Sequence, residues 1–174
     1  NGAKAELYGL DIDMEARLSS QFTINGGATW LHAKFLSFPG APTATLLPGG
    51  YPDLGFQIDA KGKDIPYSPH LTYVLGATYT IPTSAGDFAI NVTDSYNSGF
   101  YSEADNILRQ GNYHFLNASI SWTSSNENFS ARVYVNNILN EAVASQFPTI
   151  AGFGYIADYT NPPRIIGGSI SIKF

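Results

Sequence analysis

The sequence has no cysteine, few charged residues and no long hydrophobic run. Without cysteine, a disulfide scaffold and a thiolate metal site are both excluded. Charged residues make up only 13% of the 174 residues, and the net charge of −5 comes without a basic stripe that could neutralise phosphates, so we expect no nucleic-acid partner. The chain also lacks a run of about 18 apolar residues, which excludes a membrane-spanning helix.

What the chain does have is period-two alternation, most clearly in residues 164–174. Ile166, Ile170, Ile172 and Phe174 share one face of this stretch, and small polar residues occupy most of the other. This pattern is typical of a strand between an apolar and a watery surface. It suits the core face of a soluble sandwich, or the lipid-facing side of an outer-membrane barrel whose terminal Phe lies in the aromatic girdle.

The same alternation predicts an all-β fold with about seven long strands. The first strand runs through six apolar steps without a break, which is roughly twice the usual globular strand and suits a tilted strand that spans a bilayer. The predicted strands cover about residues 3–18, 22–36, 71–81, 88–101, 113–123, 129–136 and 164–174.

The connections alternate in length. Those after the first, third and fifth strands are short, and those after the second, fourth and sixth are longer, with 37–66 and 140–163 the longest. Outer-membrane barrels have this asymmetry, with short periplasmic turns and long extracellular loops. An odd strand count closes an antiparallel barrel only with a mismatched seam, so we expect part of a larger barrel. The lack of a signal peptide likewise suggests a fragment of a mature protein.

Asp94 is the weakest step of the barrel interpretation. It falls in the lipid-facing phase of the strand at 88–101, where a carboxylate is costly. Either a bulge near Thr93 resets the phase, or a neighbouring strand shields the charge.

Taken in order, several pieces of the chain resemble the carboxy-terminal barrel region of the TonB-dependent outer-membrane receptors, across essentially all 174 residues. The pieces are Ala3–Glu15, Pro69-His70, Tyr113–Asn117, Val135–Glu141, Pro163–Gly167 and the terminal Phe174.

This resemblance implies an antiparallel transmembrane β-barrel of 22 strands, of which residues 1–174 are the last seven, in the bacterial outer membrane. It also implies a receptor, not an enzyme, that imports a scarce ligand such as an iron–siderophore complex, cobalamin or an oligosaccharide. Its partners are outer-membrane lipid, a small-molecule ligand at the extracellular loops, its own plug domain and TonB. The plug and the TonB-contacting box are absent from this sequence, and no cofactor is implied.

The candidate ligand-binding residues lie on the long loops, where exposed aromatic rings suit the capture of sugars or catecholate-like rings. The alternative is that these rings pack against one another and order the loops. We expect the terminal aromatic residue, by resemblance, to be the signal that the outer-membrane assembly machinery reads. The ligand-binding candidates are Tyr51, Asp53, Phe56, Phe147, Phe153 and Tyr155, and the assembly signal is Phe174.

Other polar residues are expected to be structural. We interpret the acidic and basic residues of the first strand as a hydrated lumen wall, and the three histidines as interfacial or loop residues without a metal. No nucleophile-elbow or other placed motif supports an enzyme. These residues are Asp11, Asp13, Glu15, Arg17, His32, His70 and His114.

Two alternatives remain open at this point. One is a soluble β-sandwich binding module, whose apolar faces would meet in a core. The other is a small outer-membrane porin or enzyme, which an even strand count would favour.

Overall fold

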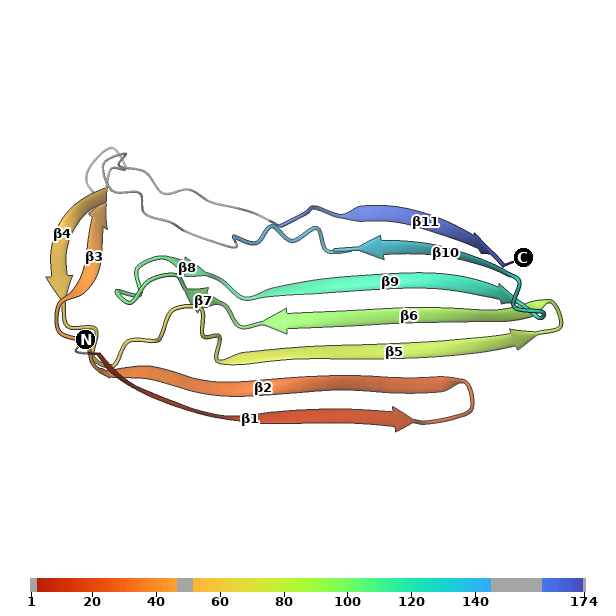
Figure 1. Cartoon of the computed structure of the whole chain (residues 1–174), viewed down its shortest axis with the longest axis horizontal. Coiled ribbons are helices and arrows are strands. Elements are labelled where there is room, and N and C mark those ends of the chain that lie inside the picture. Colours follow the sequence, from red (N-terminus) through yellow and green to blue (C-terminus); the bar gives the residue numbers. More distant parts are fainter. Residues whose placement is uncertain (1–2, 47–51, 145–160, 174) are drawn as a thin grey trace.

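A computed structural model describes residues 3–46, 52–144 and 161–173 of the chain. The described part consists of strands and connections, and its main feature is one antiparallel sheet in the order β1-β2-β5-β6-β9-β10-β11 (Figure 1). Two short hairpins, β3–β4 and β7–β8, lie outside this sheet. The strands are β1 (Lys4–Arg17), β2 (Phe22–Ser37), β3 (Ala41–Leu46), β4 (Pro52–Ile58), β5 (Leu71–Thr83), β6 (Gly86–Asn97), β7 (Phe100–Tyr101), β8 (Arg109–Gln110), β9 (Tyr113–Ser124), β10 (Phe129–Asn136) and β11 (Ile165–Ile172).

The seven long strands confirm the strand prediction, and their pairing confirms the two faces. Directly paired residues of neighbouring strands point to the same side of a sheet. Leu10 pairs with Trp30, and Trp30 pairs in turn with Leu71, so the apolar phases of β1, β2 and β5 lie on one side. The same continuity runs through β6, β9 and β10 to β11, where Val135 pairs with Ile166.

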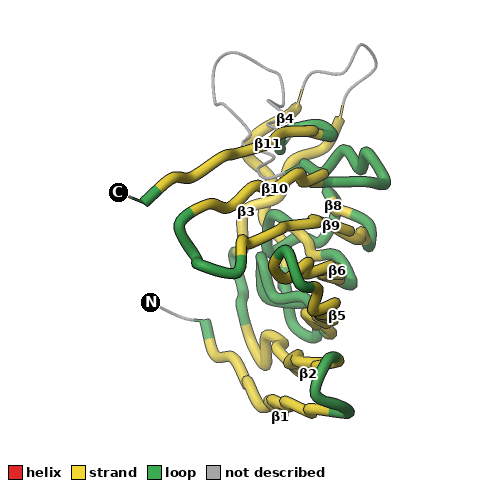
Figure 2. The backbone as a smooth tube through the Cα atoms, turned by 90° about the vertical axis from the view of Figure 1, so that its right-hand side faces the viewer, coloured by secondary structure: helices red, strands yellow, loops and turns green. Residues whose placement is uncertain are grey.

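The apolar face of this sheet is exposed. Met14 is 51% exposed, Val133 61% and Ile166 71%, and no large side chain in the described part is fully buried. The two faces of a soluble sandwich would instead bury such residues in a shared core. The sheet is a single layer, and it curves strongly when viewed end-on (Figure 2). No helix in the described ranges is long and apolar enough to span a membrane.

The turns at the two ends of the sheet differ as predicted. Short turns join β1 to β2, β5 to β6 and β9 to β10 at one end, and the long connections leave the other end (Figure 1). In the first turn, Ser19 Oγ accepts hydrogen bonds from the backbone N–H groups of Gln21 and Phe22. In the second, Gly86 adopts a φ of 132°, a conformation that other residues rarely reach.

The loop prediction needs two corrections. Residues 37–66 were predicted as one long loop, but they contain the β3–β4 hairpin. The strand predicted for 88–101 ends at Asn97, and its last two residues form β7, which pairs with β8 in the connection that follows. Both hairpins have short strands, and the first is rich in Pro and Gly, so neither carries enough alternation to be recognised in the sequence.

Two bands of aromatic residues border the apolar face. At the end with short turns, ring pairs form between Phe22 and Tyr79 (6.3 Å between centroids) and between Phe88 and Trp122 (6.4 Å). At the end with long connections the rings are those of Tyr8, Trp30, His32, Tyr73, Tyr96 and His114. Such paired girdles are found where the wall of an outer-membrane barrel crosses the two membrane interfaces.

Asp94 lies on this apolar face. The pairing of β6 with both β5 and β9 continues without a register shift through Asp94, so the alternative of a bulge near Thr93 is wrong. The shielding alternative is confirmed, because Tyr73 from β5 and His114 from β9 both contact the carboxylate.

Candidate functional site

The polar face of the sheet forms a hollow near the end from which the long connections leave. Its walls come from five consecutive strands of the sheet, β1, β2, β5, β6 and β9, so the polar face is the concave one. Tyr113 and Phe115 pack against each other there, with ring centroids 5.2 Å apart. The other polar-face residues of the hollow include Asp11, Asp13, Thr29, Thr72, Ser95 and Asn97.

The charged residues of β1 lie on this polar face, as expected for a hydrated wall. Asp11 accepts a 2.7 Å hydrogen bond from the Thr29 hydroxyl of β2. The carboxylate of Asp13 lies over Gly27, where a Cβ would come within 2.5 Å of Asp13 Oδ1. A side chain at position 27 would therefore displace this carboxylate from the wall of the hollow.

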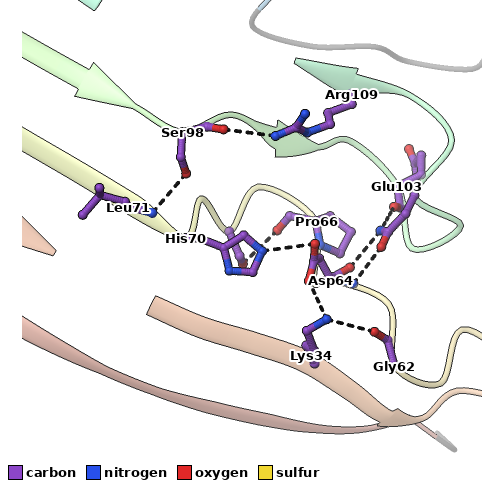
Figure 3. Close-up of polar contacts among 11 residues, drawn as sticks. Lys34, Gly62, Asp64, Pro66, His70, Leu71, Ser98, Glu103 and Arg109 are labelled. Atoms are coloured by element: carbon purple, nitrogen blue, oxygen red, sulfur yellow. Dashed lines mark hydrogen bonds and ion pairs between the residues drawn. The ribbon is translucent and has the colours of Figure 1, made fainter. Parts of the chain in front are cut away.

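Beyond this end of the sheet, Asp64 joins the segment between β4 and β5 to β2 and to the connection between β7 and β8 (Figure 3). The Asp64 carboxylate lies 3.4 Å from Lys34 Nζ of β2 and 3.2 Å from His70 Nε2, just before β5. Lys34 and Asp64 also form a backbone bridge. The segment that follows β4 is thus attached to β2.

Asn106 joins this segment to the connection between β7 and β8. Its side-chain oxygen accepts a 2.7 Å hydrogen bond from the Asp64 N–H, and its Nδ2 donates to the Asp64 carbonyl at 2.9 Å. Nδ2 also contacts the Glu103 carbonyl at 3.2 Å. Asn106 has a φ of 53°, which asparagine tolerates better than most residues. One amide side chain therefore satisfies both backbone groups of Asp64.

A small buried cluster accompanies these contacts. Ala41, Ala60 and Ala104, from three separate segments, are its buried members, and Phe35, Phe38 and Ile58 pack against it. Asp105 is buried beside the cluster and accepts a 2.9 Å hydrogen bond from the Thr43 hydroxyl. Partial burial, and then the charge of Asp105, raise the pKa of the Glu103 carboxyl. The β3–β4 hairpin, the segment that follows it and the connection between β7 and β8 consequently form one packed unit.

The connection between β10 and β11 is attached in a similar way. Asn137 donates from Nδ2 to the carbonyls of Glu141 (2.9 Å) and Pro162 (3.2 Å), and its backbone N–H donates to Asn117 Oδ1 (2.9 Å). These contacts give Asn117 and Asn137, in the stretches Tyr113–Asn117 and Val135–Glu141, a structural role: they attach the base of the loop to β9.

Each of the three histidines is paired with a carboxylate. His32 lies 3.1 Å from Glu6, His70 lies 3.2 Å from Asp64 and His114 lies 3.1 Å from Asp94. The predicted interfacial and loop positions agree with these placements. No group of three or more potential metal-ligating residues is found within residues 3–46, 52–144 and 161–173.

The predicted ligand-binding residues are only partly placed. Asp53 and Phe56 lie in β4, where they pair with Thr45 and Thr43 of β3. The remaining candidates, Tyr51, Phe147, Phe153 and Tyr155, and the assembly signal Phe174 lie outside the described residues.

Sequence reasoning missed Tyr113 and Phe115, because it sought ligand contacts on the loops and not on the wall. The sequence did carry a signal for these two residues. They are aromatic residues in the polar phase of a strand, where small polar residues are usual. It also missed Asn106, for which the sequence carries no comparable signal.

These features together define a class of protein. A curved antiparallel sheet with an exposed apolar outer face, aromatic bands at both borders of that face and long loops at one end only is a segment of an outer-membrane β-barrel wall.

The family profile for the TonB dependent receptor-like β-barrel matches residues 1–138, and the chain belongs to this family. The protein is therefore an outer-membrane protein, and members of its family are transporters, not enzymes. A search of curated proteins found no match.

Solved structures of siderophore receptors share the fold. The chain is similar to the ferric yersiniabactin uptake receptor FyuA from Yersinia pestis, with 20% identity, a TM-score of 0.78 and coverage of 100% of this chain and 24% of that one. The siderophore receptor PiuA from Acinetobacter baumannii is 15% identical, with a TM-score of 0.69 and coverage of 97% of this chain and 21% of that one. The ferripyoverdine receptor from Pseudomonas aeruginosa is 15% identical, with a TM-score of 0.65 and coverage of 100% of this chain and 20% of that one. The chain thus spans only about a quarter or less of these receptors.

Proposed function

We propose that residues 1–174 are the carboxy-terminal barrel segment of a 22-stranded receptor that imports an iron–siderophore complex with energy relayed by TonB. The plug and the TonB-contacting segment would belong to other parts of the protein. The observation that carries the proposal is the hollow on the polar face, near the long-loop end of the sheet, in a chain of the TonB-dependent family. The names of the similar solved receptors support iron–siderophore complexes over cobalamin or an oligosaccharide as the ligand.

The chemistry of the hollow suits a ligand with rings and hydrogen-bonding groups. Tyr113 and Phe115 offer aromatic faces, while Thr72, Ser95 and Asn97 offer uncharged donors and acceptors. The loop candidates would add contacts from above. These are Tyr51, Asp53, Phe56, Phe147, Phe153 and Tyr155.

The test is uptake of radiolabelled iron by cells that lack other siderophore receptors and produce the full-length protein. Ferric yersiniabactin, ferripyoverdine and a ferric catecholate are the probes, each with and without TonB. We expect TonB-dependent uptake of at least one complex. If a receptor that is assembled in the outer membrane takes up none of them, the siderophore assignment is contradicted. Uptake of cobalamin instead would identify cobalamin as the ligand.

The contribution of the hollow is tested with the complex that is imported. Tyr113→Ala should weaken binding, whereas Tyr79→Ala, an aromatic change on the lipid-facing side, should leave binding unchanged. Alanine substitution of each loop candidate extends the same comparison to the loops. If Tyr113→Ala and Tyr79→Ala bind equally well, the hollow does not contact the ligand.

A further inference from the structure

Asp94 is a carboxylate on a face that otherwise contacts lipid. Its direct neighbours across the sheet are Leu75 of β5 and Leu116 of β9. It lies six residues along β6 from Phe88 of the lower aromatic band. With a rise of about 3.3 Å per residue and a tilt of about 40°, Asp94 is about 15 Å above that band along the membrane normal, just below Tyr96 of the upper aromatic band.

Three aromatic rings surround this carboxylate. The Tyr73 hydroxyl donates to Asp94 Oδ2 at 3.2 Å, and His114 Nδ1 lies 3.1 Å from both carboxylate oxygens. The Tyr96 ring lies 5.1 Å from the Tyr73 ring and 4.8 Å from the His114 ring. The Asp94 side chain nevertheless remains 28% exposed on the membrane side. We call these four residues, Tyr73, Asp94, Tyr96 and His114, the Asp94 cluster.

The Asp94 cluster has no cationic side chain from its own strands, because β5, β6 and β9 contain neither lysine nor arginine. Its partners leave part of the Asp94 carboxylate exposed, and a carboxylate that faces lipid is unfavourable. A carboxylate has more acceptor positions than its two partners occupy. A carboxylate beside aromatic rings is the combination that binds ammonium groups, through ion pairing and cation–π attraction.

The surroundings favour a lipid as the source of the ammonium group. Directly below Asp94 on the same face of β6 lie Val92 and Ile90; Leu75 lies beside Asp94, and Ile120 lies beside Ile90. All of these except Asp94 are aliphatic. A polar site above an aliphatic strip matches a molecule whose charged head is followed by hydrocarbon chains.

We propose that the Asp94 cluster binds the primary ammonium headgroup of a membrane lipid, whose acyl chains lie along the aliphatic strip below. This site is on the outside of the barrel and is independent of ligand uptake through the lumen. It is also complete within this chain, since all four side chains belong to β5, β6 and β9.

The test uses the purified full-length receptor in detergent at neutral pH, with native mass spectrometry of retained lipids. The probes are phosphatidylethanolamine, phosphatidylglycerol and N-acetylated phosphatidylethanolamine, all with the same acyl chains. We expect about tenfold greater retention of phosphatidylethanolamine than of either other lipid, the size of effect typical of one hydrogen bond to a charged group. N-acetylation converts the ammonium group into a neutral amide and leaves the phosphate and acyl chains unchanged, so this comparison does not require a variant of the receptor.

Variants then locate the site. Asp94→Asn should abolish the preference for phosphatidylethanolamine, and Tyr96→Leu should reduce it. The matched control, Asp87→Asn in the same strand but on the polar face, should keep it. Equal retention of the three lipids would mean that His114 neutralises Asp94 without a ligand and would overturn the proposal. So would a preference that survives Asp94→Asn.

Discussion

Met14→Arg is the substitution that places a charge most directly against lipid. Met14 lies on the apolar face of β1, and its partner in β2 is Gly26, which has no side chain to shield a charge. It is six residues from Tyr8 of the upper aromatic band. This spacing places it about 15 Å from that band, near the middle of an apolar zone about 25 Å tall. An arginine there costs roughly 2–4 kcal/mol.

Because each 1.4 kcal/mol is a factor of ten, this cost corresponds to a roughly 30- to 700-fold change in the folding equilibrium. Urea titration of the full-length receptor refolded into lipid vesicles measures it, and heat modifiability on a gel follows assembly in cells. The matched control is Glu15→Arg, one residue away on the polar face. If both substitutions cost the same free energy, the assignment of the apolar phase to lipid is refuted.

Leu75→Arg refines this prediction, because Asp94 is the residue directly opposite Leu75 on β6. An arginine at position 75 can pair with that carboxylate, so it should destabilise the receptor less than Met14→Arg does. Combining Leu75→Arg with Asp94→Asn should restore the full cost. If Leu75→Arg lowers the stability of the receptor by the same amount with Asp94 and with Asn at position 94, the register of β5 and β6 is contradicted.

Three further predictions concern the ends of the strands. Cysteine introduced at Gly50 should react with a membrane-impermeant thiol reagent on whole cells and cysteine at Ser84 should not; the reverse pattern would invert the topology. Deletion of Phe174 should lower the amount of assembled receptor much more than the ligand affinity of the receptor that does assemble, and normal assembly would argue against a barrel-closing role. Asn106→Gly should speed amide exchange in residues 59–68, because glycine preserves the unusual φ but removes the side-chain hydrogen bonds. Asn112→Ala, which changes an exposed asparagine nearby, should not. Equal exchange in both variants would show that Asn106 does not hold the loops together.

How much could be predicted from the sequence depended on the length of each element. The long strands were predictable because each separates an apolar surface from a polar one. This difference produces an alternation of apolar and polar residues over the length of the strand. The pair Glu6–His32 could also have been found, because the tight turn after Leu18 fixes the register of β1 with β2. The pair Asp94–His114 could not, since a long connection separates their strands and leaves the register undetermined.

The loop contacts were beyond prediction for a different reason. Asn106 and Asp64 are 42 residues apart, and their hydrogen bonds depend on the packing of Ala41, Ala60 and Ala104. Small residues in loops give no periodic pattern that would indicate a buried cluster. The pairing of β3 with β4 was hidden in the same way.

The most direct test of the account is an accessibility scan of β1 in the full-length receptor in lipid vesicles. A nitroxide spin label is introduced at each position from Tyr8 to Arg17, and its collisions with oxygen, which enriches in lipid, are compared with those of a water-soluble nickel chelate. We predict alternation with a period of two residues, with Leu10, Ile12, Met14 and Ala16 exposed to oxygen and the intervening positions shielded from lipid. High accessibility of both sets to the nickel chelate, or alternation in the opposite phase, would contradict the assignment of this sheet to the wall of an outer-membrane barrel.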